Sequence, residues 1–146
     1  MTDQPKCKDR IRAHYGSRMA DLRAMVKAER EGNEAGPEDT GPLNEYGLCF
    51  DYVAPETFKG QRRGYWRYQL SWGGPSDEFR FYAERSGVRE DAYTVEKVEY
   101  WFLDWWDGAH RTLRQGRDFD FLCDLFRDFA ECGTVAHAYS EAIATE

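Results

Sequence analysis

The stretch from Gly64 to Tyr82 constrains the fold of this chain more than any other. Over residues 65–72 two sets of side chains alternate, one at Trp66, Tyr68, Leu70 and Trp72 and the other at Tyr65, Arg67, Gln69 and Ser71. Because a period of two places the sets on opposite faces, it predicts a β-strand. Gly-Gly-Pro-Ser then interrupts the pattern, which resumes at Phe79 and Phe81. We therefore expect a hairpin with a loop of about four residues.

Two further segments have strand patterns. Residues 48–53 alternate and end before Pro55, which predicts a short strand. Residues 94–106 alternate again, but near Trp105 and Trp106 both faces become apolar, which is typical of a central or covered strand. We expect Asp107-Gly108 to end this strand and residues 110–117 to form a turn.

Helical patterns lie at the two ends of the chain. Residues 5–31 carry apolar side chains at spacings of three and four, and Gly32 follows them. Residues 118–132 have a similar stripe, with Asp118 as the expected N-cap, and Thr134 is expected to cap a last helix. Residues 33–44 are polar and contain two prolines and two glycines, so we expect a flexible connector after the first helix.

This order of elements predicts an α+β fold. Four consecutive strands without helical crossovers favour an antiparallel sheet of about four strands, flanked by an N-terminal helix and two C-terminal helices that cover one face. The chain has 146 residues and is expected to form a single domain over residues 1–146.

Charge limits the partners that this chain can take. The formal net charge is −7; residues 1–30 hold eight Lys/Arg against four Asp/Glu, whereas residues 31–146 hold twelve against twenty-three. Such an acidic body repels phosphates and anionic lipid, so we expect no membrane partner and do not favour direct nucleic acid binding. The first ten residues lack the apolar segment of a secretory signal, and no run approaches the ~20 apolar residues of a membrane span, which predicts a cytoplasmic protein.

Metal and catalytic signatures are weak. The four cysteines lack the paired spacing of a zinc site, so we expect reduced thiols and no cofactor at Cys7, Cys49, Cys123 and Cys132. Asp104 and Asp107 offer two carboxylates that a metal-dependent enzyme could use to hold magnesium. The alternative is that they flank a turn, because positions three apart on a strand face opposite sides. The expectation is a protein without catalysis.

An acidic row along the C-terminal helix is the main candidate for partner binding. Its members recur at spacings of four, four and three, at Asp120, Asp124, Asp128 and Glu131. Such a row repeats about every 6 Å along the helix axis, which is near the phosphate separation of a nucleic acid strand. We therefore consider mimicry of DNA by this row, extended by Asp77 and Glu78 beside the hairpin turn. The alternative is a solvated helix face.

Basic residues provide a third hypothesis, direct binding of nucleic acid. They occur in the first helix at Arg10, Arg12, Arg18 and Arg23, and before the hairpin at Lys59, Arg62 and Arg63. Arginine interleaved with aromatic residues from Arg63 to Tyr68 is similar to a stacking platform for single strands. The alternative is ordinary surface charge that pairs with the acidic remainder of the fold.

The segments GYWRYQLSWGGPSDEFRFY and VEYWFLDWWDGAHR also carry a resemblance. Over about residues 45–115 the chain resembles small acidic accessory proteins of conjugative plasmids, integrative elements and phages, a setting that includes anti-CRISPR and anti-restriction inhibitors. The resemblance implies a non-catalytic inhibitor or accessory protein of a mobile genetic element. It also implies a host defence complex, a CRISPR effector or a restriction enzyme, as the partner. It assigns no functional residue.

Overall fold

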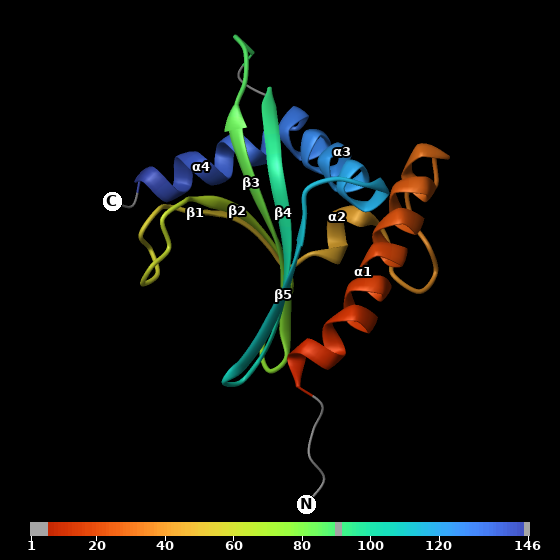
Figure 1. The fold of residues 1–146 in the computed structure, drawn as a ribbon. Helices are drawn as coiled ribbons and strands as arrows, with labels where there is room; N and C mark the ends of the chain where they lie inside the picture. The colour runs from red at the N-terminus through yellow and green to blue at the C-terminus, as the bar shows by residue number, and fades with distance from the viewer. Residues whose placement is uncertain (1–5, 90–91, 145–146) are drawn as a thin grey trace, which may run out of the picture.

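The computed structural model describes residues 6–89 and 92–144 and confirms the α+β class. Five strands, rather than four, lie between the N-terminal and the C-terminal helices (Figure 1). Along the chain the elements are α1 (Cys7–Arg30), α2 (Leu43–Tyr46), β1 (Cys49–Val53), β2 (Tyr65–Ser71), β3 (Ser76–Arg85), β4 (Tyr93–Asp104), β5 (Asp107–Leu113), α3 (Arg117–Glu131) and α4 (Thr134–Ala144).

The sheet is an antiparallel meander in the order β1-β2-β3-β4-β5. Tyr68 lies opposite Phe79, and Phe79 lies opposite Tyr100, so one row of aromatic residues crosses three strands on one face. The alternation predicted for residues 65–70 is confirmed, because Trp66, Tyr68 and Leu70 are buried together on that face. Trp72 departs from the prediction. It follows a register irregularity between Gln69 and Ser71, lies beyond the end of β2 and is 75% exposed.

The fifth strand corrects the expected end of β4. β4 stops at Asp104, Trp105 and Trp106 form a two-residue turn, and β5 returns from Asp107 to Leu113. The prediction that Trp105 and Trp106 belong to a covered strand is wrong, since they are 85% and 100% exposed. The segment DGAHRTL gave no strand signal because this terminal strand is mostly exposed and has no buried face to impose an alternating pattern.

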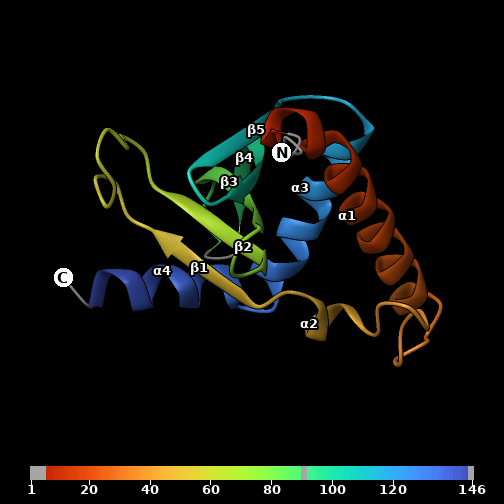
Figure 2. The same ribbon diagram turned by 90° about the horizontal axis from the view of Figure 1, so that it is seen from below.

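The helices lie on one face of the sheet, as predicted (Figures 1 and 2). Leu22 of α1, Leu122 and Phe126 of α3, and Val135 of α4 pack with Phe81 in one core, each at most 1% exposed. A fully buried side chain of this size contributes roughly 1.5–3 kcal/mol through the hydrophobic effect. This core fixes the covered face and leaves the other face of the sheet without helices.

The first residues of α3 and α4 can be compared with the start signals in the sequence. α4 begins at Thr134, the residue expected to cap it, after Gly133 adopts a φ of 88°. α3 begins two residues earlier than expected: Gly116 is its N-cap residue, not Asp118. The Asp118 carboxylate instead accepts hydrogen bonds from the Tyr15 hydroxyl and from Arg23, at 2.6 Å each, so a tertiary contact replaces the local cap.

The expected connector after α1 forms a series of turns. Gly36 and Gly41 donate backbone hydrogen bonds to Asn33 and Pro37, respectively. Gly36 has a φ of 73°, and a Cβ there would lie 2.3 Å from the Gly41 carbonyl oxygen, so only glycine fits. Leu43 then packs against the core at the start of α2. Among the helices of residues 6–89 and 92–144, none is long and apolar enough to cross a bilayer.

Candidate functional site

The face of the sheet opposite the helices is hollowed into a groove of about 830 Å³. The alternation that buries Trp66 and Tyr68 under the helices directs the intervening side chains of each strand into this groove. It is lined from the strands by Tyr65, Arg67, Gln69, Glu78, Arg80, Tyr82, Lys97, Glu99, Trp101 and His110. The loop of residues 54–64 borders one end, and Trp72 and Leu103 lie at the other.

Aromatic rings and cations stack across the groove from β5 to β2. His110 stacks on Trp101 with ring centroids 4.4 Å apart, and the Arg80 guanidinium lies 4.0 Å from the Trp101 centroid. Arg80 also lies 4.9 Å from the centroid of Tyr65, whose ring packs against Tyr82 at 5.4 Å. Each such contact contributes about 0.5–1.5 kcal/mol. This cation–aromatic ladder holds the bare face of the sheet in one conformation.

The charges at the centre of the groove are paired. Glu99 accepts hydrogen bonds from the Tyr82 hydroxyl and Trp101 Nε1, at 3.0 Å each, and from Lys97 at 3.3 Å. Burial alone would raise the pKa of Glu99, but these donors outweigh it and lower the pKa. Burial, together with the Glu99 charge, raises the pKa of Tyr82. Both pKa values therefore move away from neutrality, an arrangement suited to binding more than to proton transfer.

The predicted acidic residues of the hairpin are not at the surface. Glu78 lies in the groove, is 4% exposed and accepts a hydrogen bond from Arg80 at 2.8 Å. Asp77 faces the helices, is 3% exposed and accepts two hydrogen bonds from Arg18, at 2.7 and 2.9 Å. The Tyr100 and Ser71 hydroxyls donate to the same carboxylate, at 2.6 and 2.5 Å. Asp77 therefore joins β3 to α1 and β4, whereas Glu78 pairs within β3.

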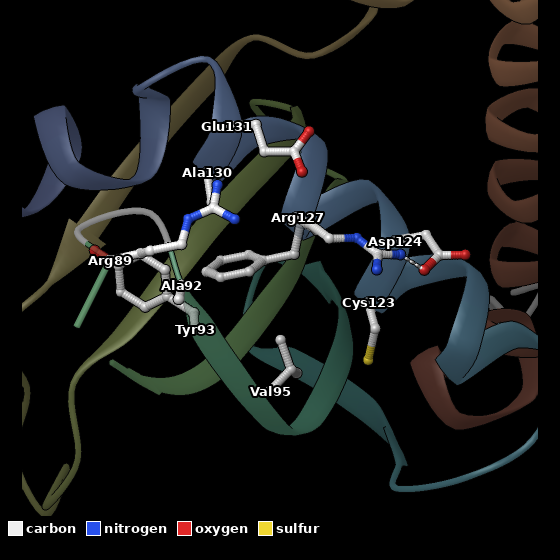
Figure 3. Close-up of a pocket in the computed structure, with 10 residues that line it drawn as sticks. Arg89, Ala92, Tyr93, Val95, Cys123, Asp124, Arg127, Ala130 and Glu131 are labelled. Carbon is white, nitrogen blue, oxygen red and sulfur yellow. Dashed lines mark hydrogen bonds and ion pairs between the residues drawn. The ribbon is translucent and has the colours of Figure 1, made fainter. Parts of the chain in front are cut away.

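The predicted row on α3 is mostly exposed. Asp120, Asp128 and Glu131 are exposed, whereas Asp124 is half-buried and paired with Arg127. Beside the row lies a pocket of about 300 Å³, whose apolar lining is Ala92, Tyr93, Val95, Phe126 and Ala130. Arg89 and the Arg127–Asp124 pair lie on opposite sides of it (Figure 3). The row is therefore acidic but interrupted by arginine.

Cys123 lines this same pocket. Burial, and then the nearby charges of Asp120 and Asp124, raise the pKa of this thiol to about 11. It is therefore protonated at neutral pH and a poor nucleophile. All four cysteines of the chain are free thiols, as expected from their spacing.

Asp104 and Asp107 flank the turn between β4 and β5 and face each other across it. Asp104 accepts a hydrogen bond from Arg10 at 2.5 Å, and Asp107 accepts one from the backbone N–H of Cys7 at 2.7 Å. Both carboxylates therefore hold the start of α1. Within the described part of the chain, no cluster of three or more His, Cys, Asp or Glu residues could bind a metal ion.

The basic residues of α1 are largely used inside the fold. Arg10, Arg18 and Arg23 form ion pairs with Asp104, Asp77 and Asp118, respectively. These three arginines therefore confirm the alternative interpretation, in which the basic residues pair with acidic residues of the same fold. Arg12 is exposed on α1, and Lys59 and Arg62 are exposed at the tip of the loop before β2.

The β2–β3 loop and the β4–β5 turn lie close together at one end of the sheet (Figure 1), and these two connections contain Trp72, Trp105 and Trp106. We call Trp72, Trp105 and Trp106 the tryptophan tip. Trp105 lies against the β2–β3 loop: a Cβ on Gly74 would be 3.4 Å from its Nε1. Trp105 also has a φ of 55°, a left-handed conformation that costs a non-glycine residue roughly 1–2 kcal/mol.

The sequence contains a turn signal at Trp105 and Trp106, although the alternating pattern before it favoured a strand. Two aspartates flank Trp105 and Trp106, and such polar flanks are typical of a two-residue turn. The apolar character of the tryptophans favoured a continuous strand instead. Of the three tryptophans, Trp72 also lines the groove, so the tryptophan tip adjoins the groove at Trp72.

Comparison with protein-family models, curated proteins and solved structures finds no significant match to this chain.

Proposed function

We propose that this protein is a non-catalytic binding protein that docks on another protein through the tryptophan tip and the adjoining part of the groove. The observation that carries the proposal is the turn Trp105-Trp106. Folding alone would favour glycine at a φ of 55° and a polar residue at a fully exposed turn position. Backbone strain and exposed tryptophan together are a cost to the isolated protein, and burial against a partner offsets that cost.

The groove supports the same function. Its ladder is built from arginine, tyrosine and tryptophan, the residues that dominate binding energy at protein interfaces. Tyr65 is buried, but Arg80 and Trp101 are partly exposed. Because these two are already held in place by their neighbours, they lose little conformational freedom when a partner binds. Within the groove, Arg80 and Lys97 pair with Glu78 and Glu99, whereas Lys59 and Arg62 of the bordering loop stay exposed.

The resemblance to accessory proteins of mobile elements supports a host nucleic-acid-handling protein as the partner, such as a CRISPR effector or a restriction enzyme. Such a partner has basic surfaces, and the exposed Asp120, Asp128 and Glu131 of α3 offer a second contact to them. A defence complex of this kind also places the protein in the cytoplasm. On this proposal the acidic row supplies electrostatic attraction, and the tryptophan tip supplies most of the affinity.

The test is affinity capture from a bacterial lysate that carries CRISPR and restriction systems, after nuclease treatment. The variant Trp72→Ser/Trp106→Ser removes two exposed rings without altering the strained residue. The matched control is Val88→Ser, which removes an apolar side chain that is 99% exposed. Loss of the captured protein with the tryptophan variant, and its retention with the control, is the expected result. Equal recovery from both variants, or recovery of nucleic acid alone, would contradict the proposal.

A second variant separates the acidic row from the tip. Asp120→Asn/Asp128→Asn/Glu131→Gln removes three exposed charges from α3. If the row contributes, the complex weakens and its dependence on salt concentration becomes flatter. An unchanged salt dependence would remove the acidic row from the interface while leaving the tryptophan tip in place.

A further inference from the structure

We propose that two copies of this chain associate through β5 and join their sheets edge to edge. β5 is the last strand of the sheet, and within the described residues it pairs only with β4. Asp107, Gly108, His110, Arg111 and Thr112 are all exposed. Its register with β4 has no irregularity, and the strand contains no proline or lysine, which are among the features that protect an open edge. This inference is independent of the tryptophan tip.

The opposite edge of the sheet is different. β1 has five residues and is followed within two positions by Pro55. A short strand next to a proline is a poor template for pairing. β5, with seven regularly paired residues, is therefore the edge at which another strand can add.

The two-residue turn determines which backbone groups of β5 face outward. In such a hairpin the flanking residues, Asp104 and Asp107, form a hydrogen-bonded pair, and hydrogen-bonded pairs then alternate along the ladder. Ala109 and Arg111 therefore direct their N–H and C=O groups toward β4. The groups of Gly108, His110 and Thr112 point away from the sheet and are available to a further strand.

A second copy fits this edge because its charges are complementary under two-fold symmetry. An antiparallel register centred on His110 pairs all seven residues of β5 with those of β5 in the other copy. Gly108 then lies opposite Thr112, and Asp107 lies opposite Leu113. Asp107, which also accepts the Cys7 N–H, is diagonal to Arg111 of the other copy, within reach of a long side chain. Within its own copy, the Arg111 guanidinium lies 4.6 Å from the centroid of the Tyr15 ring. No like charges are placed opposite each other at this edge.

The first test is the mass of the protein in solution, measured by sedimentation equilibrium over a wide concentration range. We expect association toward twice the 17.1 kDa of one chain. Thr112→Pro removes an outward N–H without breaking the β4–β5 ladder and should leave a monomer. Thr112→Val keeps the N–H and should still dimerise. Circular dichroism establishes that both variants are folded.

A symmetric cross-link supplies a second test that does not depend on the proline variant. In this register His110 lies opposite its own copy at a Cα separation of about 5.5 Å, within disulfide range. His110→Cys, in a background that lacks the exposed Cys49 and Cys132, should form a dimer on oxidation. Thr112→Cys is the matched control, because its two copies would be about 13 Å apart along the strands.

Three results would overturn this proposal. The first is a wild-type protein that stays monomeric up to its solubility limit. The second is a folded Thr112→Pro variant that dimerises as well as Thr112→Val. The third is equal cross-linking by the cysteine variants at 110 and 112. A monomer that pairs β5 only with an added partner peptide would show that this edge takes a different occupant.

Discussion

Replacing Arg18 with methionine tests how α1 is held on the sheet. Arg18 donates two hydrogen bonds to the buried Asp77 and a third, at 2.8 Å, to the hydroxyl of Tyr46. Methionine keeps the unbranched stem and the helix propensity, so the substitution removes mainly the guanidinium. The matched control is Arg12→Met, on the exposed side of the same helix. Its effect on the free energy of unfolding should be within about 0.5 kcal/mol.

The expected loss for Arg18→Met follows from the environment of Asp77. Removing one partner of a buried ion pair costs about 3–5 kcal/mol, because the other charge stays buried without compensation. Tyr100 and Ser71 still donate to the carboxylate, and the Arg18 side chain is 24% exposed. We therefore expect a loss near the lower end, about 3 kcal/mol at neutral pH. The melting temperature should fall by roughly 10 °C.

The pH dependence gives the sharper result. In the wild type, burial would raise the pKa of Asp77, but the hydrogen bonds from Arg18, Ser71 and Tyr100 outweigh it and lower the pKa below 3.8. The stability that Asp77 contributes is therefore complete above the unfolded pKa and is lost as the pH falls through the folded pKa. Without Arg18, only the Ser71 and Tyr100 hydroxyls oppose the rise in pKa that burial causes. The pKa of Asp77 in the folded variant therefore rises above its unfolded value. The variant then recovers stability as the pH falls from about 7 toward about 4.

Urea unfolding followed by tryptophan fluorescence measures both effects. The difference between the wild type and Arg18→Met should shrink on acidification, and Arg18→Met/Asp77→Asn should recover part of the loss because no buried charge remains. A loss below about 1 kcal/mol at neutral pH would refute the argument that this ion pair holds α1. So would a difference that stays constant as the pH falls.

Further predictions concern the tryptophan tip, the core and the thiols. Trp105→Gly should raise the free energy of unfolding by about 1 kcal/mol in urea titrations, because glycine adopts a φ of 55° without strain; a loss would mean that contacts of the ring outweigh the strain. Phe126→Ala, at a side chain that is 1% exposed, should lower that free energy by about 3–5 kcal/mol in the same assay. In the folded protein near neutral pH, Cys123 should react with a disulfide reagent much more slowly than the exposed Cys132, since its pKa is about 11. Equal rates would contradict the burial of that thiol.

The predictions that succeeded depended on periodic burial. Trp66 and Tyr68 alternate with polar residues because one face of β2 lies under helices, and that requirement is visible in the sequence. Leu122 and Phe126 recur at helical spacing on α3 for the same reason. Where a buried face imposes a period, the sequence therefore predicts both the element and its orientation.

The failures occurred where no such period exists or where another requirement overrides it. β5 is an edge strand with little burial, so its sequence need not alternate. Trp105 and Trp106 are apolar but exposed, and hydrophobicity alone placed them in a strand. Asp77 is charged but buried, and its partner Arg18 lies 59 positions away in the sequence. Such a pairing depends on the tertiary fold and has no local signal.

The cation–aromatic ladder also explains why exposed tryptophan is concentrated at one end of the sheet. A sheet with helices on only one side must either cover its second face or make that face compatible with water. Here Arg80, Tyr65 and Trp101 cover one another, and Glu99 and Lys97 neutralise one another, so the face has little apolar surface left to bury. The tryptophan tip lies beyond the ladder and has no comparable cover. A partner that gains affinity by burying apolar surface gains most at that tip, which favours a protein with an apolar pocket over a nucleic acid backbone.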